Sequence, residues 1–401
     1  MRTNSLGAFP LFLAACVVGL TSCSQHMSNS LNSSNPPGSN PPGGSPADSN
    51  GPHIYLAANS SSGGASTYGF SVSSDGQLTP ISGFPLSYSI WGVASGNYLF
   101  ATNADGVHID TYKIGSDGSL TKVQSFDDTK ASANACAQCQ PGMPQLADPT
   151  GTKLYISAGY LDGGDWNATL QTFSIDPSTG AISYVSTDMP IEGRDWAQVY
   201  GSFSGNAAYL YGTNETTFTN NVVLASQTSN GSLSASPTEP ALHGLSSSSV
   251  DSMVIGTDST SHLVAAIQAS NANGDPGAPI NLASFTINSD GSLTTTNSSE
   301  QMPQAPSLNG SVSPDGTLIA MAGAKSGIQL YNFNGADPIT ALGGVFATDQ
   351  ITSLSWDKQH HLYALSSSHM LYVFNVTSAG ATPAPGSPHS VPNAFNLLVQ
   401  P

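Results

Sequence analysis

The segment SSDGQLTP, Ser73–Pro80, decides the fold because similar segments return along the chain. They are GSDGSLTK at Gly115–Lys122, TSNGSLSA at Thr228–Ala235 and NSDGSLTT at Asn288–Thr295. Each has a short turn around a glycine, followed by a leucine and a hydroxyl residue. Glycine, asparagine and aspartate tolerate the positive φ that tight hairpin turns require. Recurrence of one local pattern along a chain indicates a repeat architecture.

An alternating segment precedes most of these turns. Apolar or aromatic residues alternate in it with polar ones, which is typical of a β-strand. Its copies are TYGFSV (Thr67–Val72), IDTYKI (Ile109–Ile114), LQTFSI (Leu170–Ile175), LASFTI (Leu282–Ile287), IQLYNF (Ile328–Phe333) and LYVFNV (Leu371–Val376). The glycine turn therefore joins the third strand of each repeat to the fourth.

A second class of turn joins the first strand of a repeat to the second. Its copies are ASGNY, DPTGTK, FSGNAA, TDSTSH, SPDGTL and WDKQHH. Units made of the second to fourth strands begin near His53, Asn97, Lys153, Ala207, His262, Thr317 and His361. The first unit lacks a first strand, whereas the C-terminal segment AFNLLVQ, Ala394–Gln400, is a first strand without partners.

These two incomplete ends complement each other. We predict an all-β, seven-bladed β-propeller with four antiparallel strands per blade. Its ring closes where Ala394–Gln400 pairs with the strand that begins at His53. The alternatives are a pair of β-sandwiches or an open solenoid.

The low content of basic residues restricts the kinds of molecule that the protein is expected to bind. Charged residues make up 8% of the 401 residues, against about 25% in ordinary globular chains. The chain has 8 Lys and Arg against 25 Asp and Glu, a net charge of −17. Nucleic-acid binding needs clustered basic residues, so no nucleic-acid partner is expected. The acidity favours solubility, and we expect a monomer.

The N-terminal segment is a predicted targeting signal. Its apolar run, Leu6–Leu20, is too short to span a membrane. LTSC at Leu20–Cys23 resembles a bacterial lipobox; the alternative is an ordinary secretory signal with a chance cysteine. We expect a signal peptide at 1–22, a disordered Ser/Asn/Pro/Gly tether at 23–52 and the propeller at 53–401. Lipid on Cys23 would be the only membrane contact of an extracytoplasmic protein, periplasmic or attached to the outer membrane.

The repeat also resembles the lactonase-like propeller family. The resemblance is carried by Thr67–Leu86, Thr172–Val185, Ser311–Gly323 and Gly386–Pro401. It implies a seven-bladed fold. It also implies hydrolysis of phosphogluconolactone or cycloisomerisation of muconates by a His, an Arg and a Glu in the central mouth.

That family site is matched in part. The family's Asn-Glu pair corresponds to Asn214 and Glu215. Its histidine falls near Gly142–Gln145 and its arginine near Val199, where other residue types stand. The single arginine after Cys23 is Arg194, so Glu215 and Arg194 are the candidate catalytic residues.

Long insertions are confined to two classes of loop, those joining second to third strands and fourth to first strands. They would lie on one rim, where loops usually carry function, although they could also be neutral surface variation. The insertions are Asp127–Gly142, Gly159–Ala168, Pro190–Gln198, Thr213–Asn221 and Ala269–Pro279.

EGRDW, Glu192–Trp196, is the most distinctive of these segments. Arg194 could pair with a carboxylate ligand and Trp196 could stack on it. Glu192 and Asp195 complete the group, and the alternative is an internal ion pair beside a packed tryptophan.

DGGDW, Asp162–Trp166, adds Asp165 and Trp166 to the predicted rim, together with Asn214. Asp162 and Asp165 could bind Ca²⁺ or could belong to a solvated turn.

Two cysteines, Cys136 and Cys139, form the motif CAQC. No adjacent ligands complete a zinc site, and no helix is predicted that would activate a redox pair. Outside the cytoplasm a short disulfide is the favoured interpretation. The histidines show no metal-binding spacing, so no metal and no other cofactor is predicted.

Taken together, the sequence favours a non-enzymatic binding scaffold for a small molecule, a sugar or a protein at the propeller rim. The alternative is a lactone hydrolase of the lactonase-like type, with Glu215 and Arg194 near the channel mouth.

Overall fold

The computed structural model describes residues 51–59, 64–103, 107–128, 140–162, 165–188, 200–205, 207–214, 219–235, 250–258, 260–269, 280–301, 306–323 and 327–400. All of them belong to one compact unit, Pro46–Pro401. The predicted signal peptide, Cys23 and most of the tether lie outside the described residues. Within these ranges the regular structure is strand only, and no helix that could cross a membrane is found.

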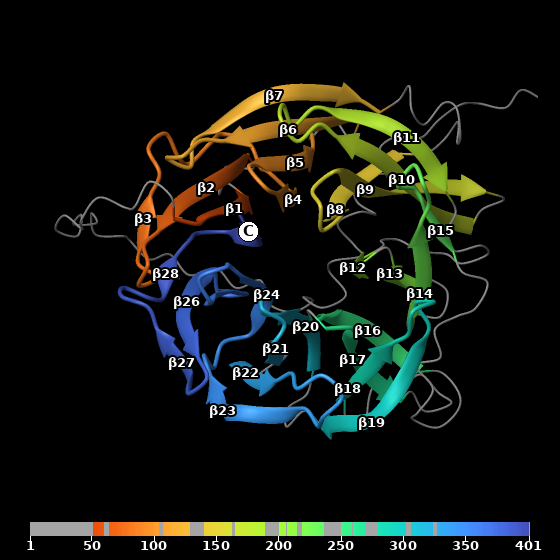
Figure 1. Ribbon diagram of the computed structural model, residues 1–401. Helices are drawn as coiled ribbons and strands as arrows, with labels where there is room; N and C mark the ends of the chain where they lie inside the picture. Colours follow the sequence, from red (N-terminus) through yellow and green to blue (C-terminus); the bar gives the residue numbers. More distant parts are fainter. Residues whose placement is uncertain are drawn as a thin grey trace, which may run out of the picture. The chain divides into compact units, whose positions relative to one another are not determined.

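The strands form seven antiparallel sheets, numbered here as blades in chain order and each given from first to fourth strand (Figure 1). Blade 1 contains β29 (Ala394–Val399), β1 (His53–Asn59), β2 (Ala65–Val72) and β3 (Leu78–Pro80); blade 2 contains β4 (Gly92–Ser95), β5 (Tyr98–Thr102), β6 (His108–Ile114) and β7 (Leu120–Asp127). Blade 3 contains β8 (Gln140–Ala147), β9 (Lys153–Asp162), β10 (Asp165–Ile175) and β11 (Ile182–Asp188); blade 4 contains β12 (Tyr200–Ser204), β13 (Ala207–Asn214), β14 (Thr219–Gln227) and β15 (Leu233–Ala235).

The remaining blades repeat this order. Blade 5 contains β16 (Val250–Thr257), β17 (His262–Ala269), β18 (Ile280–Ile287) and β19 (Leu293–Gln301); blade 6 contains β20 (Pro306–Val312), β21 (Leu318–Gly323), β22 (Gly327–Asn332) and β23 (Thr340–Phe346). Blade 7 contains β24 (Ile351–Trp356), β25 (His361–Ser366), β26 (Met370–Thr377) and β27 (Gly380–Pro383), and β28 (His389–Ser390) also pairs with β26.

The two ends of the chain close the ring, as predicted. β29 pairs antiparallel with β1 from Ile54↔Val399 to Ala58↔Ala394. Beyond the strands, the Gln400 amide donates to the His53 carbonyl at 2.9 Å. In Figure 1 the C-terminus lies beside β1. The predicted seven-bladed propeller is therefore confirmed, and the sandwich and solenoid alternatives are wrong.

The core lies between neighbouring blades. The second strands β1 and β25 are buried along nearly their whole length, since each is covered on both faces. Clusters of buried residues span the seams, as where Tyr363 and Val373 of blade 7 join Ile54 and Leu56 of blade 1. Burying one such side chain contributes roughly 1.5–3 kcal/mol, so adjacent blades stabilise each other.

Both predicted classes of turn require positive φ. In the third-to-fourth-strand turns Gly76, Gly118, Gly231 and Gly291 have φ values of 82°, 78°, 85° and 82°. In the first-to-second-strand turns glycine takes this role in four blades, at positions 96, 151, 205 and 316. Blade 5 and blade 7 use Ser261 (φ 107°) and His360 (φ 64°) there instead.

The glycine turn also has a second role, which local pattern did not reveal. Buried tyrosine hydroxyls donate to the glycine carbonyl of the next blade. Tyr55 bonds to Gly118, Tyr155 to Gly231 and Tyr209 to Gly291, each at 2.8 Å. The recurrent segment thus fixes both the hairpin and its neighbour blade.

Candidate functional site

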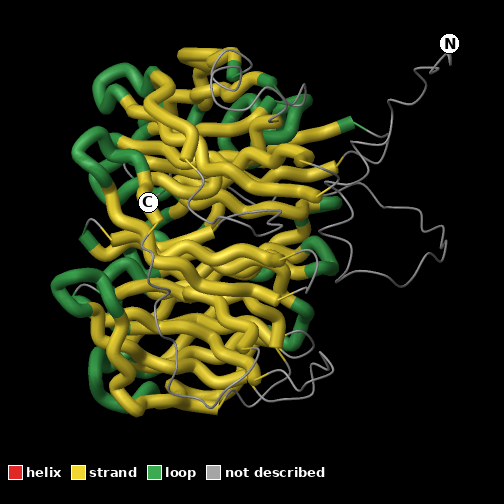
Figure 2. The backbone as a smooth tube through the Cα atoms, turned by 90° about the vertical axis from the view of Figure 1, so that its right-hand side faces the viewer, coloured by secondary structure: helices red, strands yellow, loops and turns green. Residues whose placement is uncertain are grey.

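Connectivity divides the connections between strands into two sets. Those joining second to third strands and fourth to first strands leave one end of the sheets, which we call the loop face. Those joining first to second and third to fourth strands leave the other end, which we call the turn face. Figure 2 shows the strands running between these two ends of the sheets. Every long insertion noted in the sequence connects strands at the loop face.

Three predicted rim residues, together with the Ca²⁺ candidate Asp162, lie at the loop-face ends of neighbouring blades 3 and 4. Asp162 ends β9 and is the register partner of Asp165, the first residue of β10; Trp166 follows it opposite Leu161. Asn214 ends β13 opposite Thr219. The other predicted residues lie outside the described ranges: Glu192, Arg194, Asp195, Trp196, Glu215, Cys136 and Cys139.

An aromatic pair on the loop face was missed by the sequence analysis. Trp91 precedes β4 and Phe395 is the second residue of β29, so both stand where first strands of the ring begin. Their rings meet edge to face with centroids 5.6 Å apart. Phe395 keeps 37% of its surface exposed. The segment SYSIW, ahead of a first strand, was the available signal.

A second aromatic pair joins Tyr88 of the same connection to the buried Tyr112, further from the ring's inner strands. Tyr88, 40% exposed, stacks on Tyr112 of β6 at 6.0 Å and 18°. Thr67 holds the connection in place, since its hydroxyl donates to the Tyr88 carbonyl at 2.7 Å and accepts the Ile90 amide at 2.9 Å. We call Tyr112, Tyr88, Trp91 and Phe395 the aromatic row.

A buried carboxylate supports the outer end of the aromatic row. Lys122 Nζ lies 2.7 Å from Asp110 Oδ2, and the Tyr112 hydroxyl donates to the same oxygen at 3.2 Å. Ser125 donates to Oδ1 at 2.6 Å and Asn103 to Oδ2 at 3.2 Å. Burial, with the nearby Asp110 charge, raises the pKa of Tyr112. Both oxygens of Asp110 are therefore engaged in holding the fold.

Blade 7 fixes the opposite side of the aromatic row. His369, in the turn between β25 and β26, bonds through Nδ1 to the Ala394 carbonyl at 3.0 Å. Asp349 accepts the hydroxyls of Ser368 at 2.9 Å and Tyr372 at 2.8 Å. These hydrogen bonds link the β25–β26 turn to the β23–β24 connection and to the start of β29, where Phe395 lies.

The first strands of the blades are nearly uncharged. These strands, β29, β4, β8, β12, β16, β20 and β24, contain no His, Lys, Arg or Glu, and their sequences include one Asp, Asp251 of β16. Hydroxyl and amide groups link neighbouring first strands instead. Asn309 donates to the Thr352 carbonyl at 2.8 Å, and Thr257 donates to the Phe203 carbonyl at 2.8 Å. General acid–base chemistry would thus need residues from the loops.

No group of three or more potential metal ligands occurs among the residues that the structure describes. The predicted Ca²⁺ position at Asp162 and Asp165 therefore rests on the sequence and on their register pairing alone.

Comparison with solved structures shows the fold. The chain is similar to a protein from Lactobacillus plantarum at 12% identity and a TM-score of 0.57, covering 87% of this chain and 98% of that one. It is equally similar to the periplasmic gluconolactonase PpgL of Pseudomonas aeruginosa, with the same four values. No family model matches the chain. No curated protein matches it either. Lactonase-like propellers are therefore among its structural neighbours.

Proposed function

We propose that this protein is a binding scaffold whose loop face holds a sugar, another small molecule or a protein. The observation that carries the proposal is the aromatic row. Tyr88 and Phe395 are exposed on a surface whose backbone is held rigidly by hydrogen bonds. Tyrosine and tryptophan bind well because they offer large contact areas at low entropic cost.

The polar groups beside the aromatic row favour binding over catalysis. Asp110 has four hydrogen-bonding partners and Asp349 accepts two hydroxyls through Oδ2, so both carboxylates are engaged in holding the fold. The long insertions of blades 2 to 5 would extend the contact surface with Glu192, Asp195, Trp196, Asp165, Trp166 and Asn214. In this proposal lipid on Cys23 tethers the propeller outside the cytoplasm, and Asp162 with Asp165 is the place to look for Ca²⁺.

The alternative function is lactone hydrolysis with Glu215 and Arg194. Glucono-1,5-lactone is the direct probe, because its hydrolysis releases a proton that a pH indicator reports. We expect the full chain to hydrolyse it no faster than buffer. Hydrolysis that disappears in Glu215→Gln would overturn the scaffold proposal in favour of the enzyme.

Binding is tested with a panel of neutral oligosaccharides and glucono-1,5-lactone in a thermal-shift assay on the full chain. A ligand that binds the folded state raises the melting temperature. We expect a positive probe to lose its shift in Trp91→Ala and Phe395→Ser, because stacking area is removed. Val345→Ser is the matched control, since Val345 is 38% exposed outside the row. Equal loss in the control would contradict the proposal.

A further inference from the structure

Several seams between blades share one packing contact on the turn face, which is absent at Gly380, the aligned glycine of blade 7. The first side chain of the second strand lies over the positive-φ glycine of the next blade. His53 covers Gly118, Tyr98 covers Gly180 and Lys153 covers Gly231; a Cβ on any of these glycines would collide with the covering side chain. The aligned residues of blades 1 to 7 are His53, Tyr98, Lys153, Ala207, His262, Leu318 and His361.

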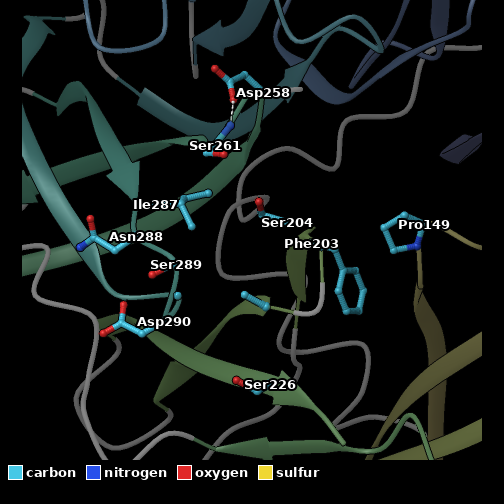
Figure 3. A pocket seen from close by; sticks show the side chains of 13 residues that line it. Pro149, Phe203, Ser204, Ser226, Asp258, Ser261, Ile287, Asn288, Ser289 and Asp290 are labelled. Carbon is cyan, nitrogen blue, oxygen red and sulfur yellow. Dashed lines mark hydrogen bonds between the residues drawn. The ribbon is translucent and has the colours of Figure 1, made fainter. Parts of the chain in front are cut away.

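Blade 4 departs from this pattern, because the residue aligned with His53, Tyr98 and Lys153 is Ala207, which has a single methyl side chain. A groove of about 790 Å³ opens there between blade 4 and blade 5, lined by Ala207, Ser204, Ser226, Asp258, Ile287 and Asp290 among others. Figure 3 shows Ile287 to Asp290 along one side of the opening, with Phe203, Ser204 and Pro149 across from them. A methyl group cannot fill the space that imidazole, phenol or lysine fills at other seams.

Ile287 gives independent evidence that solvent reaches an apolar side chain of the groove. It ends the third strand of blade 5 and is partly exposed. The apolar residues at the same position in four other blades are buried, with Ile114 at 4%, Ile175 at 5%, Phe333 at 4% and Val376 at 6%, whereas the polar Gln227 of blade 4 is partly exposed. An apolar floor is therefore left open to solvent at this one seam among those compared.

The adjacent seam shows what such a groove accommodates. At the blade 3–blade 4 seam the aliphatic stem of Lys153 runs over Gly231, beside the turn that contains Asn230. In the open groove the aligned turn residue is Asp290. An apolar stem ending in an ammonium group would thus find the same path, with a carboxylate in place of a neutral amide.

The charge of the groove matches such a ligand. Hydrogen bonds from Ser292 lower the pKa of Asp290. Burial raises the pKa of Asp258, but hydrogen bonds from Thr260 and His262 outweigh it and leave that pKa below its usual value. Asp258 and Asp290 are therefore both ionised at neutral pH. Burial raises the pKa of Tyr209, and the charge of Asp290 raises it further, which places Asp290 close to the seam. None of the described residues lining the groove is basic.

We propose that this groove is a second binding site, on the face opposite the aromatic row, for a primary alkylammonium group on a four- to five-carbon stem. The ligand is either a lysine side chain of a partner polypeptide or a free diamine. Ala207 provides the space, Ile287 contacts the stem, and Asp290 attracts the ammonium group.

Ligand-observed NMR titration of the full chain tests the site with three probes. These are Nα-acetyl-lysine N-methylamide, 1,5-diaminopentane and, as a control without the charge, Nα-acetyl-norleucine N-methylamide. We expect the two amines to bind and the norleucine compound not to. Tighter binding of the lysine compound identifies a polypeptide source, whereas tighter binding of the diamine identifies a small amine. Binding of neither amine, or of norleucine equally well, overturns the proposal.

Two variants localise the binding. Ala207→Lys restores the covering residue that blade 3 has at this position and should abolish binding. Asp290→Asn copies the turn of blade 4, where Asn230 accepts the Ser232 amide at 3.0 Å much as Asp290 accepts that of Ser292 at 2.9 Å. It should keep the fold and weaken binding about two- to fivefold, as expected for an exposed ion pair. Asp117→Asn, the same change in blade 2, should leave binding unchanged; an equal loss there would contradict the site.

Discussion

At the scale of residues, Asp357, His361 and Tyr363 form a buried polar cluster beside the ring closure. Asp357 Oδ2 accepts the Tyr363 hydroxyl at 2.6 Å and lies 2.7 Å from His361 Nδ1. Burial alone would lower the pKa of His361, but the hydrogen bond and charge of Asp357 raise it overall. The carbonyl of Ser74 and the carboxylate of Asp75, across the seam in blade 1, act in the same direction.

This cluster predicts a pH dependence of stability. A histidine whose pKa is raised by folding stabilises the protein fully below its unfolded value of 6.5, and that contribution is lost as pH rises through the folded-state pKa. We expect the free energy of unfolding from urea curves to fall more between pH 6.5 and 8.5 in the natural protein than in His361→Gln. Parallel pH profiles of the two proteins would show that His361 does not carry this effect.

At the scale of elements, the glycine turn has two roles: its glycine adopts a positive φ, and it packs under a side chain of the neighbouring blade. These roles can be tested separately. Gly118 has φ 78° and lies under His53, whereas Gly83 has φ 87° and no atom within 4 Å of the position that a Cβ would take. Alanine at Gly83 would suffer backbone strain alone. Alanine at Gly118 would also collide with the neighbouring blade's side chain.

We therefore expect Gly118→Ala to be more destabilising than Gly83→Ala. Backbone strain costs about 1–2 kcal/mol at either position, and overpacking adds about 1–3 kcal/mol at Gly118. Chemical denaturation of both variants measures the difference. Equal losses would mean that the turn does not anchor the seam.

The hairpin turns and the strands could be predicted from the sequence, whereas the seam contacts and the aromatic row could not. The hairpin turns and strands follow from period-two alternation and from residues that tolerate positive φ, which are local signals. The seam contacts depend on the offset between blades, so Ala207 looked like an ordinary strand residue. The aromatic row also escaped prediction, because Trp91 and Phe395 are far apart in sequence and meet through the ring closure alone. The charged rim group around Arg194 lies outside the described residues and stays a prediction.

At the scale of the whole molecule, the ring depends on one strand from the opposite end of the chain. Leu397, Leu398 and Val399 of β29 are buried in the seams beside blade 1. Without β29, the β1 edge would lose its hydrogen-bonding partners and blade 1 would lose part of its core. Trp91 would lose Phe395 at the same time, so the loop face depends on the closure as well.

Amide hydrogen exchange is the most direct test of this account. It compares the full chain with a chain that ends at Asn393. We predict that protection of β1 amides, together with that of the seam strands β2 and β25, falls sharply in the shortened chain because the ring is open. Unchanged protection of β1 would contradict the claim that pairing of the two chain ends holds the propeller together.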